Sequence, residues 1–275
     1  MTTPAPLPLQ QHPFFAQALR RMGRDVRQIE IECGQPIVAV RVFGQLLTSR
    51  GPIWDGEPSP SAKTDAVCGT GLRLINAENM DTDALAAANF RQLATSASVA
   101  ELDLRGDAAM RLAATQGKWR NRWRHAQAAP VTLLQERFDP AAHQWLLDAD
   151  RAQQRQKRFR GLPHALILAL AAQQAVDVHV AYLDATPLAA MLFIKHRPVV
   201  TYHLGWISTE GRQWGLHHRI LINAAAAFAN QDYVRMYLGT VDTDNAPGLA
   251  RFKIGSGARI RSLGGSWLRF GLMRG

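Results

Sequence analysis

The sequence has few cysteines and no long apolar segment, and both features exclude classes of protein. Cys33 and Cys68 lack a close thiol partner and the spacing of metal ligands. This pattern argues against a disulfide framework, a zinc site and thiol redox chemistry. No apolar run reaches the roughly 18 residues of a membrane span, and the opening MTTPAPLPLQQHP lacks the charged and apolar blocks of a signal peptide. We therefore expect a cytoplasmic protein that holds no metal.

Acidic residues are also scarce, because 22 Asp and Glu stand against 32 Lys and Arg, for a net charge of +10. Such an excess concentrates anions near the protein, whether nucleic acid, phospholipid headgroups or phosphorylated small molecules. It also serves solubility alone, so charge does not choose a partner. With 47% hydrophobic and 20% charged residues, the 275-residue chain has the composition of one large or two modest globular domains.

Familiar nucleophile motifs are absent as well. The sequence contains neither a G-x-S-x-G elbow nor the Cys/His signature of a thiol enzyme. This counts against a hydrolase or a thiol mechanism. It is compatible with direct acyl transfer to an amine, which needs an oxyanion donor, an aligned amine and a proton acceptor, but no covalent nucleophile.

The hydrophobic periodicity of the second half predicts a defined succession of elements. In order, these are a strand at 131–137, helices at 141–159 and 164–174, strands at 177–184, 188–196 and 199–206, a helix at 213–231, a strand at 233–239, a short helix at 246–254, and one or two closing strands at 258–270. The three central strands are joined by tight turns, which is typical of an antiparallel meander.

This succession resembles the GNAT N-acyltransferase fold, and the local sequence resembles its FemAB-like branch, in which two GNAT-like halves are fused. The segments YHLGW, GRQWGLHHRIL and PGLARFKIGSGA are similar to the C-terminal half of that group. QQHPFFAQALRRMG, SRGPIW and GKWRNRWRHA are similar to its N-terminal half. The resemblance implies an α+β (mixed α/β) fold of tandem GNAT-like halves, each a mostly antiparallel central sheet flanked by helices.

The resemblance also divides the chain into a degenerate N-terminal half at 1–127 and an acyltransferase half at 128–275. In the first half we expect strands at 25–34, 36–44 and 46–54, a Pro/Ser-rich loop near 56–65 and a helix at 81–93. No residue-by-residue repeat links the two halves, so the duplication is implied by the resemblance alone.

A donor site is implied at the start of the helix predicted at 213–231. Arg212, Gly215 and His217 fall at the spacing of the GNAT phosphate loop, R/Q-x-x-G-x-G/A, where backbone N–H groups at a helix start point at a pyrophosphate. His217 replaces the final small residue of that pattern. FemAB-like enzymes commonly take aminoacyl-tRNA in place of an acyl-CoA such as acetyl-CoA, and the loop does not choose between them. Alternatively, Gly215 only lets the chain turn, and Arg212 is solvated.

The segment DTDNAPGLARFKIGSGA, at 242–258, combines the signals of a short helix with a pair of cations. Asp244 or Asn245 can cap the helix, Pro247 suits its first turn, and Gly255 and Gly257 can end it.

The resemblance places Phe252 and Lys253 near the acyl-transfer centre. It implies that Lys253 stabilises the developing oxyanion and that Phe252 walls the pocket, with Arg251 projecting near the splayed strand as a donor-binding residue. The alternative is a core phenylalanine and a surface cation.

Five side chains near the predicted cleft are candidates for accepting the proton: His217, His218, Tyr237, Asp242 and Asp244. A histidine titrates closest to neutral pH, but histidines are spread along the chain and water can serve as well. Asp242 is counted with Phe252 and Lys253 as a catalytic candidate.

The segment GKWRNRWRHA places Trp119 and Trp123 four residues apart, so a helix would carry both on one face among Lys118, Arg120, Arg122 and Arg124. In one interpretation the tryptophans dock on the core and the cations are solvated. In others the cations bind tRNA or single-stranded nucleic acid, or an acidic acceptor between the halves.

Two classes of function follow. The first is an N-acyltransferase that moves an acyl or aminoacyl group from a CoA thioester or aminoacyl-tRNA to an amine, with the acceptor open among small amines, peptidoglycan precursors, lipids and protein termini. The second is a non-catalytic basic module that binds RNA or the surface of an anionic membrane. The phosphate-loop spacing together with ARFKIGSGA favours the enzyme.

Overall fold

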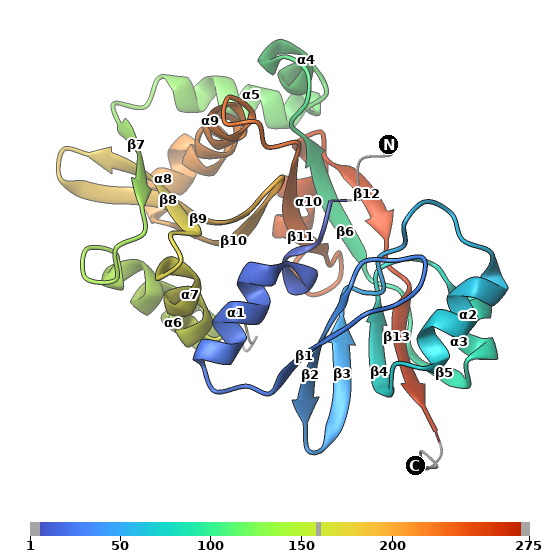
Figure 1. The fold of residues 1–275 in the computed structure, drawn as a ribbon. Helices are drawn as coiled ribbons and strands as arrows, with labels where there is room; N and C mark the ends of the chain where they lie inside the picture. The colour runs from blue at the N-terminus through green and yellow to red at the C-terminus, as the bar shows by residue number, and fades with distance from the viewer. Residues whose placement is uncertain (1–5, 158–160, 271–275) are drawn as a thin grey trace. The chain divides into compact units, whose positions relative to one another are not determined.

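The computed structural model describes residues 6–157 and 161–270, and the chain folds as two compact units (Figure 1). Unit 1 comprises residues 1–98 and 261–275, and unit 2 comprises residues 99–260. This division differs from the predicted one at 127/128. The reason is that β6 (Ser98–Asp103) pairs in the sheet of unit 2 and α5 (Gly117–Gln127) packs on its helix α9 (Leu216–Ala229).

Unit 1 is built on a six-stranded mixed sheet in the order β1-β2-β3-β4-β13-β5. Its elements are η1 (Leu9–Gln11), α1 (Pro13–Arg21), β1 (Val26–Ile29), β2 (Ile37–Val42), β3 (Gln45–Ser49), α2 (Pro60–Cys68), β4 (Leu72–Ala77), α3 (Thr82–Ala87), β5 (Phe90–Ala94) and β13 (Gly265–Arg269). The strands β1, β2 and β3 form an antiparallel meander, and β4 then lies parallel to β3.

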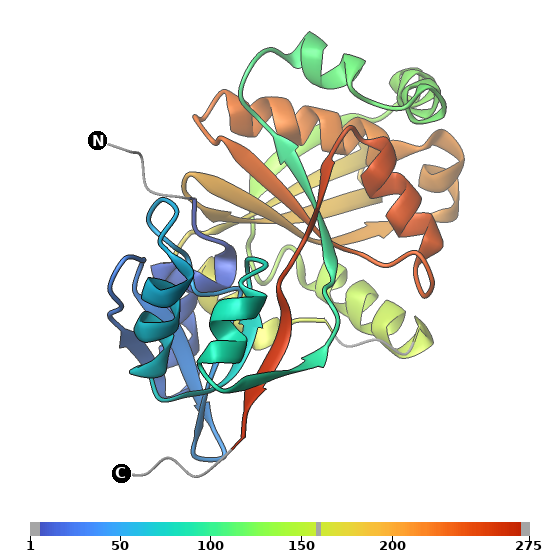
Figure 2. The ribbon, with the colours of Figure 1, turned by 90° about the vertical axis from the view of Figure 1, so that its right-hand side faces the viewer.

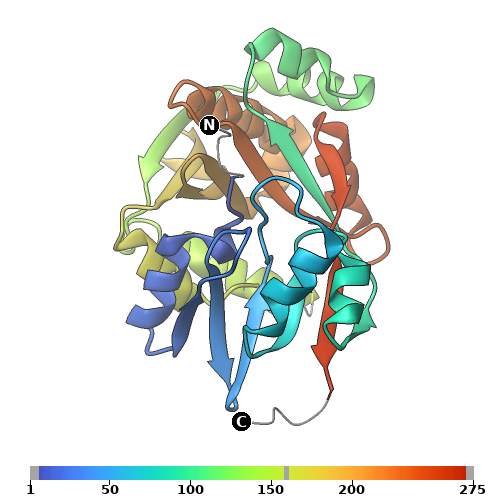
Figure 3. The same ribbon diagram turned by 45° about the vertical axis from the view of Figure 1, so that its right-hand side comes forward.

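Helices cover both faces of this sheet. Because successive side chains of a strand point to opposite faces, Ile37 and Ala39 pack in one core while Val38 packs in another. The first core contains residues of α2 and α3, which lie over the sheet in Figure 3. The second contains Ala16 of α1.

Two predictions for the first half need correction. The helix predicted at 81–93 ends at Ala87, because Asn89 has a φ of +62° and Phe90 begins strand β5, where it is buried opposite Arg269 of β13. The loop predicted near 56–65 contains the start of α2. The sequence contains the usual signals of a helix start, a serine followed by a proline. In the structure Ser59 is the N-cap, where its Oγ accepts a hydrogen bond from Ala62 N at 3.2 Å, and Pro60 is the first helical residue.

Unit 2 contributes most of a seven-stranded sheet in the order β12-β6-β11-β10-β9-β8-β7. After β6, its elements are α4 (Ala108–Ala113), α5, β7 (Thr132–Arg137), α6 (Gln144–Lys157), α7 (His164–Ala171), β8 (Val176–Leu183), β9 (Thr186–His196), β10 (Val199–Ile207), α8 (Thr209–Trp214), α9, β11 (Arg235–Val241), α10 (Pro247–Gly255) and β12 (Arg259–Ser262). The strands from β7 to β10 pair antiparallel, which confirms the predicted meander, and β11 is parallel to β10.

The helix α9 lies on one face of this sheet, and α6 and α7 lie on the other (Figures 1 and 2). The sequence of α9 explains its position, because its buried residues recur at helical spacing: Leu216, Ile220, Leu221, Ala224, Ala225 and Phe228. They pack against Phe193 of β9 and Val200 of β10 in the main core. Among the helices of the described chain, none is long and apolar enough to cross a membrane.

Three predicted elements of the second half differ in detail. The helix predicted at 213–231 is two helices, α8 and α9, because Gly215 is left-handed between them. The helix predicted at 141–159 is α6, and residues 158 and 159 lie outside the described residues. The closing strands are two, and they join different sheets: β13 pairs with β4 and β5 of unit 1. Strand partners distant in sequence cannot be inferred from local periodicity.

Candidate functional site

The strands β10 and β11 separate partway along their length. Their parallel pairing joins Val199 to Arg235, Val200 to Met236 and Thr201 to Tyr237, yet β10 continues to Ile207 and β11 to Val241. A bulge at His203 marks the same region of β10, where the register with β9 shifts. Beyond Thr201 and Tyr237 the two strands are therefore no longer paired with each other. This is the splay that the GNAT resemblance implies, and the side chains predicted to act lie around it.

The loop between α8 and α9 is where the phosphate-binding residues were predicted. Ser208 Oγ caps α8 by accepting a hydrogen bond from Gly211 N at 2.9 Å, and α8 ends at Gly215, which has a φ of +76°. That backbone region favours glycine, so Gly215 serves the turn that the alternative interpretation described. The α9 helix starts at the next residue, so the N–H groups of Leu216 and His217 point back toward this loop, while His218 N donates to the carbonyl oxygen of Gly215 at 3.0 Å.

A side chain from α5 lies over this loop. The guanidinium of Arg122 donates to the carbonyl oxygen of Arg212 at 2.7 Å, and Arg122 Nε lies 3.5 Å from the position of a Cβ on Gly215. Gly215 is buried, whereas Arg212 and Arg122 are exposed. Two arginines thus stand at the start of α9, and the backbone of Gly215 lies beneath one of them. Close approach of a phosphate to Gly215 stays a prediction, and it would require Arg122 to move.

His217 faces the splay. Its Nε2 lies 2.9 Å from the carbonyl oxygen of Trp206, and because a carbonyl only accepts, Nε2 carries the proton. Burial lowers the pKa of His217 to about 4, so the ring is neutral near pH 7. His217 therefore ties the first turn of α9 to the splayed end of β10, which a small residue at the same place in the phosphate-loop pattern could not do.

Aromatic side chains from three helices meet beside His217. The ring of Phe252 in α10 lies 5.2 Å from that of His218 and 5.9 Å from that of Trp119 in α5. Trp119 Nε1 donates to the carbonyl oxygen of Phe252 at 2.9 Å, which fixes α5 against α10. Burial also lowers the pKa of His218 to about 4. Phe252 packs against the main core, so its core role is established and its predicted role as a pocket wall stays a prediction.

Lys253 is buried at the splayed end of β11. Its side chain is only 5% exposed, and Nζ donates to the carbonyl oxygen of Thr240 at 2.7 Å. The neighbouring Gly239 has a φ of +81°, and a Cβ there would lie 3.5 Å from Nζ. Burial lowers the pKa of Lys253 to about 8. Lys253 is therefore not a surface cation, because its ammonium group is buried and bonded to Thr240, beyond the last residue of β11 that pairs with β10.

Asp242 organises the loop between β11 and α10. Its Oδ1 accepts from the backbone N of Asn245 at 2.8 Å and of Asp244 at 3.1 Å, and Oδ2 accepts from Asn245 Nδ2 at 2.9 Å. Hydrogen bonds from the backbone and side chain of Asn245, and from Asp244, lower the pKa of Asp242 below its usual range. A carboxylate stabilised in this way is a weak proton acceptor. The contacts give Asp242 a role in shaping the loop, and its catalytic role stays a prediction.

The predicted site residues thus fall into two groups. His217, Phe252 and Lys253 are on elements that border the splay, and Gly215 and Arg212 form the turn before α9. Arg251 lies on the exposed side of α10. In the part of the chain that the structure describes, His, Cys, Asp and Glu do not gather in threes as a metal site needs, and the two cysteines are free.

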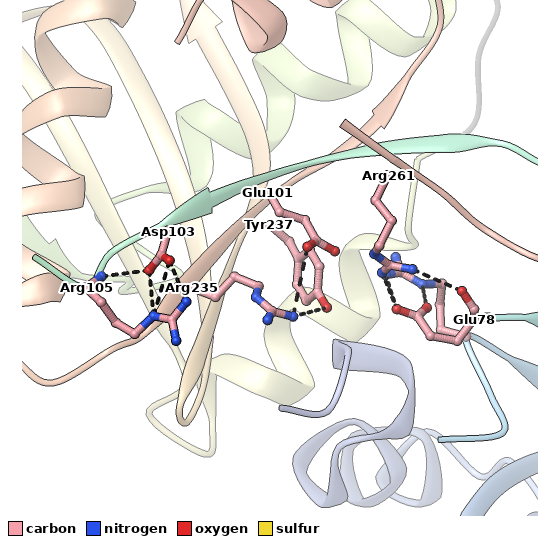
Figure 4. Close-up of polar contacts among 8 residues, drawn as sticks. Glu78, Glu101, Asp103, Arg105, Arg235, Tyr237 and Arg261 are labelled. Atoms are coloured by element: carbon pink, nitrogen blue, oxygen red, sulfur yellow. Dashed lines mark hydrogen bonds and ion pairs between the residues drawn. The ribbon is translucent and has the colours of Figure 1, made fainter. Parts of the chain in front are cut away.

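Buried ion pairs are the main feature that the sequence patterns did not reveal (Figure 4). In unit 2, Glu101 of β6 lies 3.9 Å from Arg235 of β11, whose Nη1 is 3.4 Å from Tyr237 Oη at the last paired position before the splay. In unit 1, the buried carboxylate of Glu78 forms ion pairs with both Arg50 and Arg261. The charged residues within the strand sequence SVAELD were the available signal for the first pair.

Comparison with known proteins agrees with this geometry. No protein-family model and no curated protein matches the chain, but solved structures do. FemX superposes with a TM-score of 0.71 at 13% identity, over 94% of this chain and 93% of that one. The chain has the fold of FemX. That match spans both units, so the tandem GNAT-like architecture of the FemAB type is confirmed.

Two further structures share the FemX-like fold. The C-terminal domain of a putative lysylphosphatidylglycerol synthetase from Agrobacterium fabrum has a TM-score of 0.59 at 15% identity, over 96% of this chain and 89% of that one. L-PGS from Bacillus licheniformis has a TM-score of 0.59 at 13% identity, over 95% and 93%. Identities this low establish the fold alone, so activity, donor and acceptor are inferred from the site.

Proposed function

We propose that this chain is a cytoplasmic N-acyltransferase that transfers an acyl or aminoacyl group to an amine by direct attack. The observation that carries the proposal is the separation of β10 from β11 with the buried ammonium group of Lys253 at its edge. The burial of Lys253 favours the enzyme over a basic binding module, since an exposed cation binds anions without the cost of desolvation that lowers the pKa of Lys253 to about 8.

The donor carbonyl lies between the splayed strands in this mechanism. The acceptor amine attacks the carbonyl carbon, a C–N bond forms, and negative charge develops on the carbonyl oxygen. Lys253, still protonated near pH 7, stabilises that charge, and the backbone N–H groups of the splayed strands are further donors. The C–S or C–O bond to the leaving group then breaks. The proton lost by the amine passes to the leaving group or to water, because His217 and His218, with pKa values lowered to about 4, are weak bases.

Two donors fit the start of α9. The N–H groups of its first turn, with Arg212 and Arg122 beside them, suit the pyrophosphate of an acyl-CoA such as acetyl-CoA or the phosphates of an aminoacyl-tRNA. The burial of Gly215 beneath Arg122 favours aminoacyl-tRNA, whose phosphates can be held by arginines without close backbone approach. A neighbour named for lysylphosphatidylglycerol supports an aminoacyl group as the transferred unit. The acceptor is an amine on a small molecule or a cell-envelope component.

The experiment is a donor discharge assay combined with calorimetry. Acetyl-CoA and charged tRNA are titrated in turn, and each is then incubated with the enzyme and a panel of amines while release of free thiol or deacylated tRNA is followed. We expect saturable binding of one donor and amine-dependent discharge. Ligands that remain with gently purified protein, identified by mass spectrometry, guide the choice of amines. Absence of binding to both donors would contradict the proposal.

A further inference from the structure

One end of the six-stranded sheet of unit 1 carries exposed phenylalanines and arginines. At this end β2 stops at Val42 and β3 begins at Gln45, while β13 stops at Arg269 opposite the first residue of β5. The residues that project there are exposed, and we call them the sheet-end surface: Arg24, Arg41, Val42, Phe43, Arg91 and Phe270. The β2–β3 hairpin extends from the sheet in Figure 1.

Phe43 occupies the tip of this hairpin in an unfavourable backbone conformation. Val42 pairs with Gln45, so Phe43 and Gly44 form a two-residue turn, with φ values of +48° and +78°. Turns of this kind favour Asn or Gly, and a bulky residue at positive φ is strained. Phe43 is 99% exposed, so burial within the protein does not offset this strain. A contact outside the folded chain could offset this strain.

Basic residues surround the two phenylalanines. The hydrogen bond from Arg41 N to Asp25 O places Arg24 beside the hairpin tip, and Arg20 and Arg21 are exposed at the end of α1 just before it. Arg91 opens β5 next to β13, which leads to Phe270, itself 58% exposed. Asp25, an acidic residue at this end, is paired with Arg27 and Arg41. The surface therefore combines apolar tips with a net positive charge.

We infer that the sheet-end surface docks on an anionic lipid bilayer, with Phe43 and Phe270 entering the interface and the arginines contacting lipid phosphates. Amphipathic surfaces bind membranes when apolar side chains reach the boundary between headgroups and acyl chains while cations stay at the headgroups. The arrangement fits a membrane better than RNA, because aromatic residues that stack on bases line grooves that follow the backbone, whereas Phe43 stands at a protruding tip beside aliphatic Val42. The inference concerns unit 1 and does not depend on the transferase chemistry proposed for unit 2.

The test measures binding of the full chain to vesicles. Co-sedimentation is compared for vesicles of phosphatidylcholine alone and of phosphatidylcholine and phosphatidylglycerol in equal parts, at low and high salt. We expect binding only to the anionic vesicles, weakened by salt. Phe43→Asn should lower this affinity about tenfold, because it removes most of an interfacial phenylalanine. Since Asn tolerates the left-handed turn, its melting temperature should equal or exceed that of the unchanged protein. Arg24→Gln should lower affinity about fivefold.

Matched variants separate this role from general stickiness. Met80 is 59% exposed beyond the other end of β4, so Met80→Gln should leave vesicle binding unchanged. Phe43→Trp should bind anionic vesicles as the unchanged protein does, in contrast to Phe43→Asn. The inference fails if the unchanged protein does not bind anionic vesicles, or if Phe43→Asn binds them normally. It also fails if sedimentation velocity shows that the unchanged protein is a dimer and Phe43→Asn a monomer. In that case the hairpin tip would bind a second copy of this chain. Loss of tRNA binding in Arg24→Gln, with vesicle binding intact, would assign the surface to RNA.

Discussion

The two units share a topology but differ where their parallel strands meet. In unit 1, the meander β1–β2–β3 is followed by α2 and then by β4 parallel to β3; in unit 2, β8–β9–β10 is followed by α8 and α9 and then by β11 parallel to β10. The next strand in each sheet comes from elsewhere in the chain, β13 beside β4 and β6 beside β11. The same arrangement of elements therefore occurs twice, although no residue repeat links the halves.

The difference lies in how far the parallel strands stay paired. β3 pairs with β4 up to its last residue, Ser49, opposite Asn76. β10 leaves β11 after Thr201 and runs on to Ile207. The paired strands of unit 1 use their backbone groups on each other, so they have none to offer a donor. In unit 2, residues 202–207 of β10 and 238–241 of β11 are not paired with each other, which is why we propose that the donor binds there.

One helical lysine in each unit shows a related difference, although α2 connects β3 to β4 and α10 follows β11. Lys63 in α2 is paired with the carboxylate of Asp81 at 2.8 Å, so its charge is neutralised. Lys253 in α10 donates to a carbonyl oxygen, and its charge remains available to a developing oxyanion. Under the proposed function, unit 1 keeps the fold for structure and unit 2 carries the chemistry.

The largest effect should come from Lys253. Lys253→Met removes a charge that acts in the transition state, so turnover in the discharge assay should fall by about 10²–10³ while the donor dissociation constant stays nearly the same. Lys63→Met in unit 1 is the control, and turnover per folded molecule should not change. Equal turnover in the two variants would remove Lys253 from the chemistry.

The pH dependence follows from the same lysine. With its pKa lowered to about 8, Lys253 loses its proton as pH rises above that value, so turnover should fall about tenfold per pH unit beyond it. Lys253→Arg should flatten this descending limb, since the guanidinium stays charged. A rate that keeps rising to pH 10 in the unchanged protein would show that the ammonium form is not required.

The stability of the protein should also reflect this pKa. Between pH 8 and about 10.4, the unfolded chain binds more protons at Lys253 than the folded chain does, so the free energy of unfolding rises with pH in this window. Lys253→Met should lack this rise. Denaturant titrations of both proteins at pH 7.5 and 9.5 measure it, and parallel pH profiles would contradict the burial of the lysine.

A smaller effect, on stability, should distinguish the segments that connect the parallel strands in the two units, each of which contains a glycine. Gly215→Val places a β-branched residue at a φ of +76°, which should cost about 1–2 kcal/mol and lower the melting temperature by roughly 2–8 °C. Gly69 at the end of α2 has a φ of −75° and open space around it, so Gly69→Val should stay within about 0.5 kcal/mol. If Gly215→Val keeps its stability but loses the donor, the glycine contacts the phosphate.

The smallest effect is expected at Asp242. Asp242→Asn keeps an oxygen that can accept from the backbone of Asn245, so turnover should change by no more than about threefold. A loss of two orders of magnitude with normal stability would instead make Asp242 the proton acceptor.

Much of this arrangement could be predicted from the sequence, because it depends on residues that are close together in the chain. Alternating apolar residues and tight turns predicted the meander, and the spacing of Trp119 and Trp123 predicted a helix that docks, as Trp119 does on Phe252. The loop role of Asp242 was likewise present in DTDN, a sequence that favours side-chain to backbone bonds.

The remaining features depend on contacts between distant residues. The spacing of Arg212, Gly215 and His217 is the same for a phosphate loop and for a left-handed turn, so only the backbone angle separates them. The neutral state of His217 and the lowered pKa of Lys253 arise from burial in the folded protein. The placement of β13 in the sheet of unit 1 depends on pairing with β4, far away in the chain.

Amide hydrogen exchange with and without donor tests the central claim most directly, because it compares the two units in one sample. Acetyl-CoA and charged tRNA are added in turn, and exchange is followed by peptide mass spectrometry. The account predicts that the bound donor slows exchange in residues 202–207, 215–218 and 238–241, where the strands of unit 2 separate, and leaves β3 and β4 of unit 1 unchanged. Protection confined to β3 and β4, or absent from the splayed strands while a donor is bound, would contradict it.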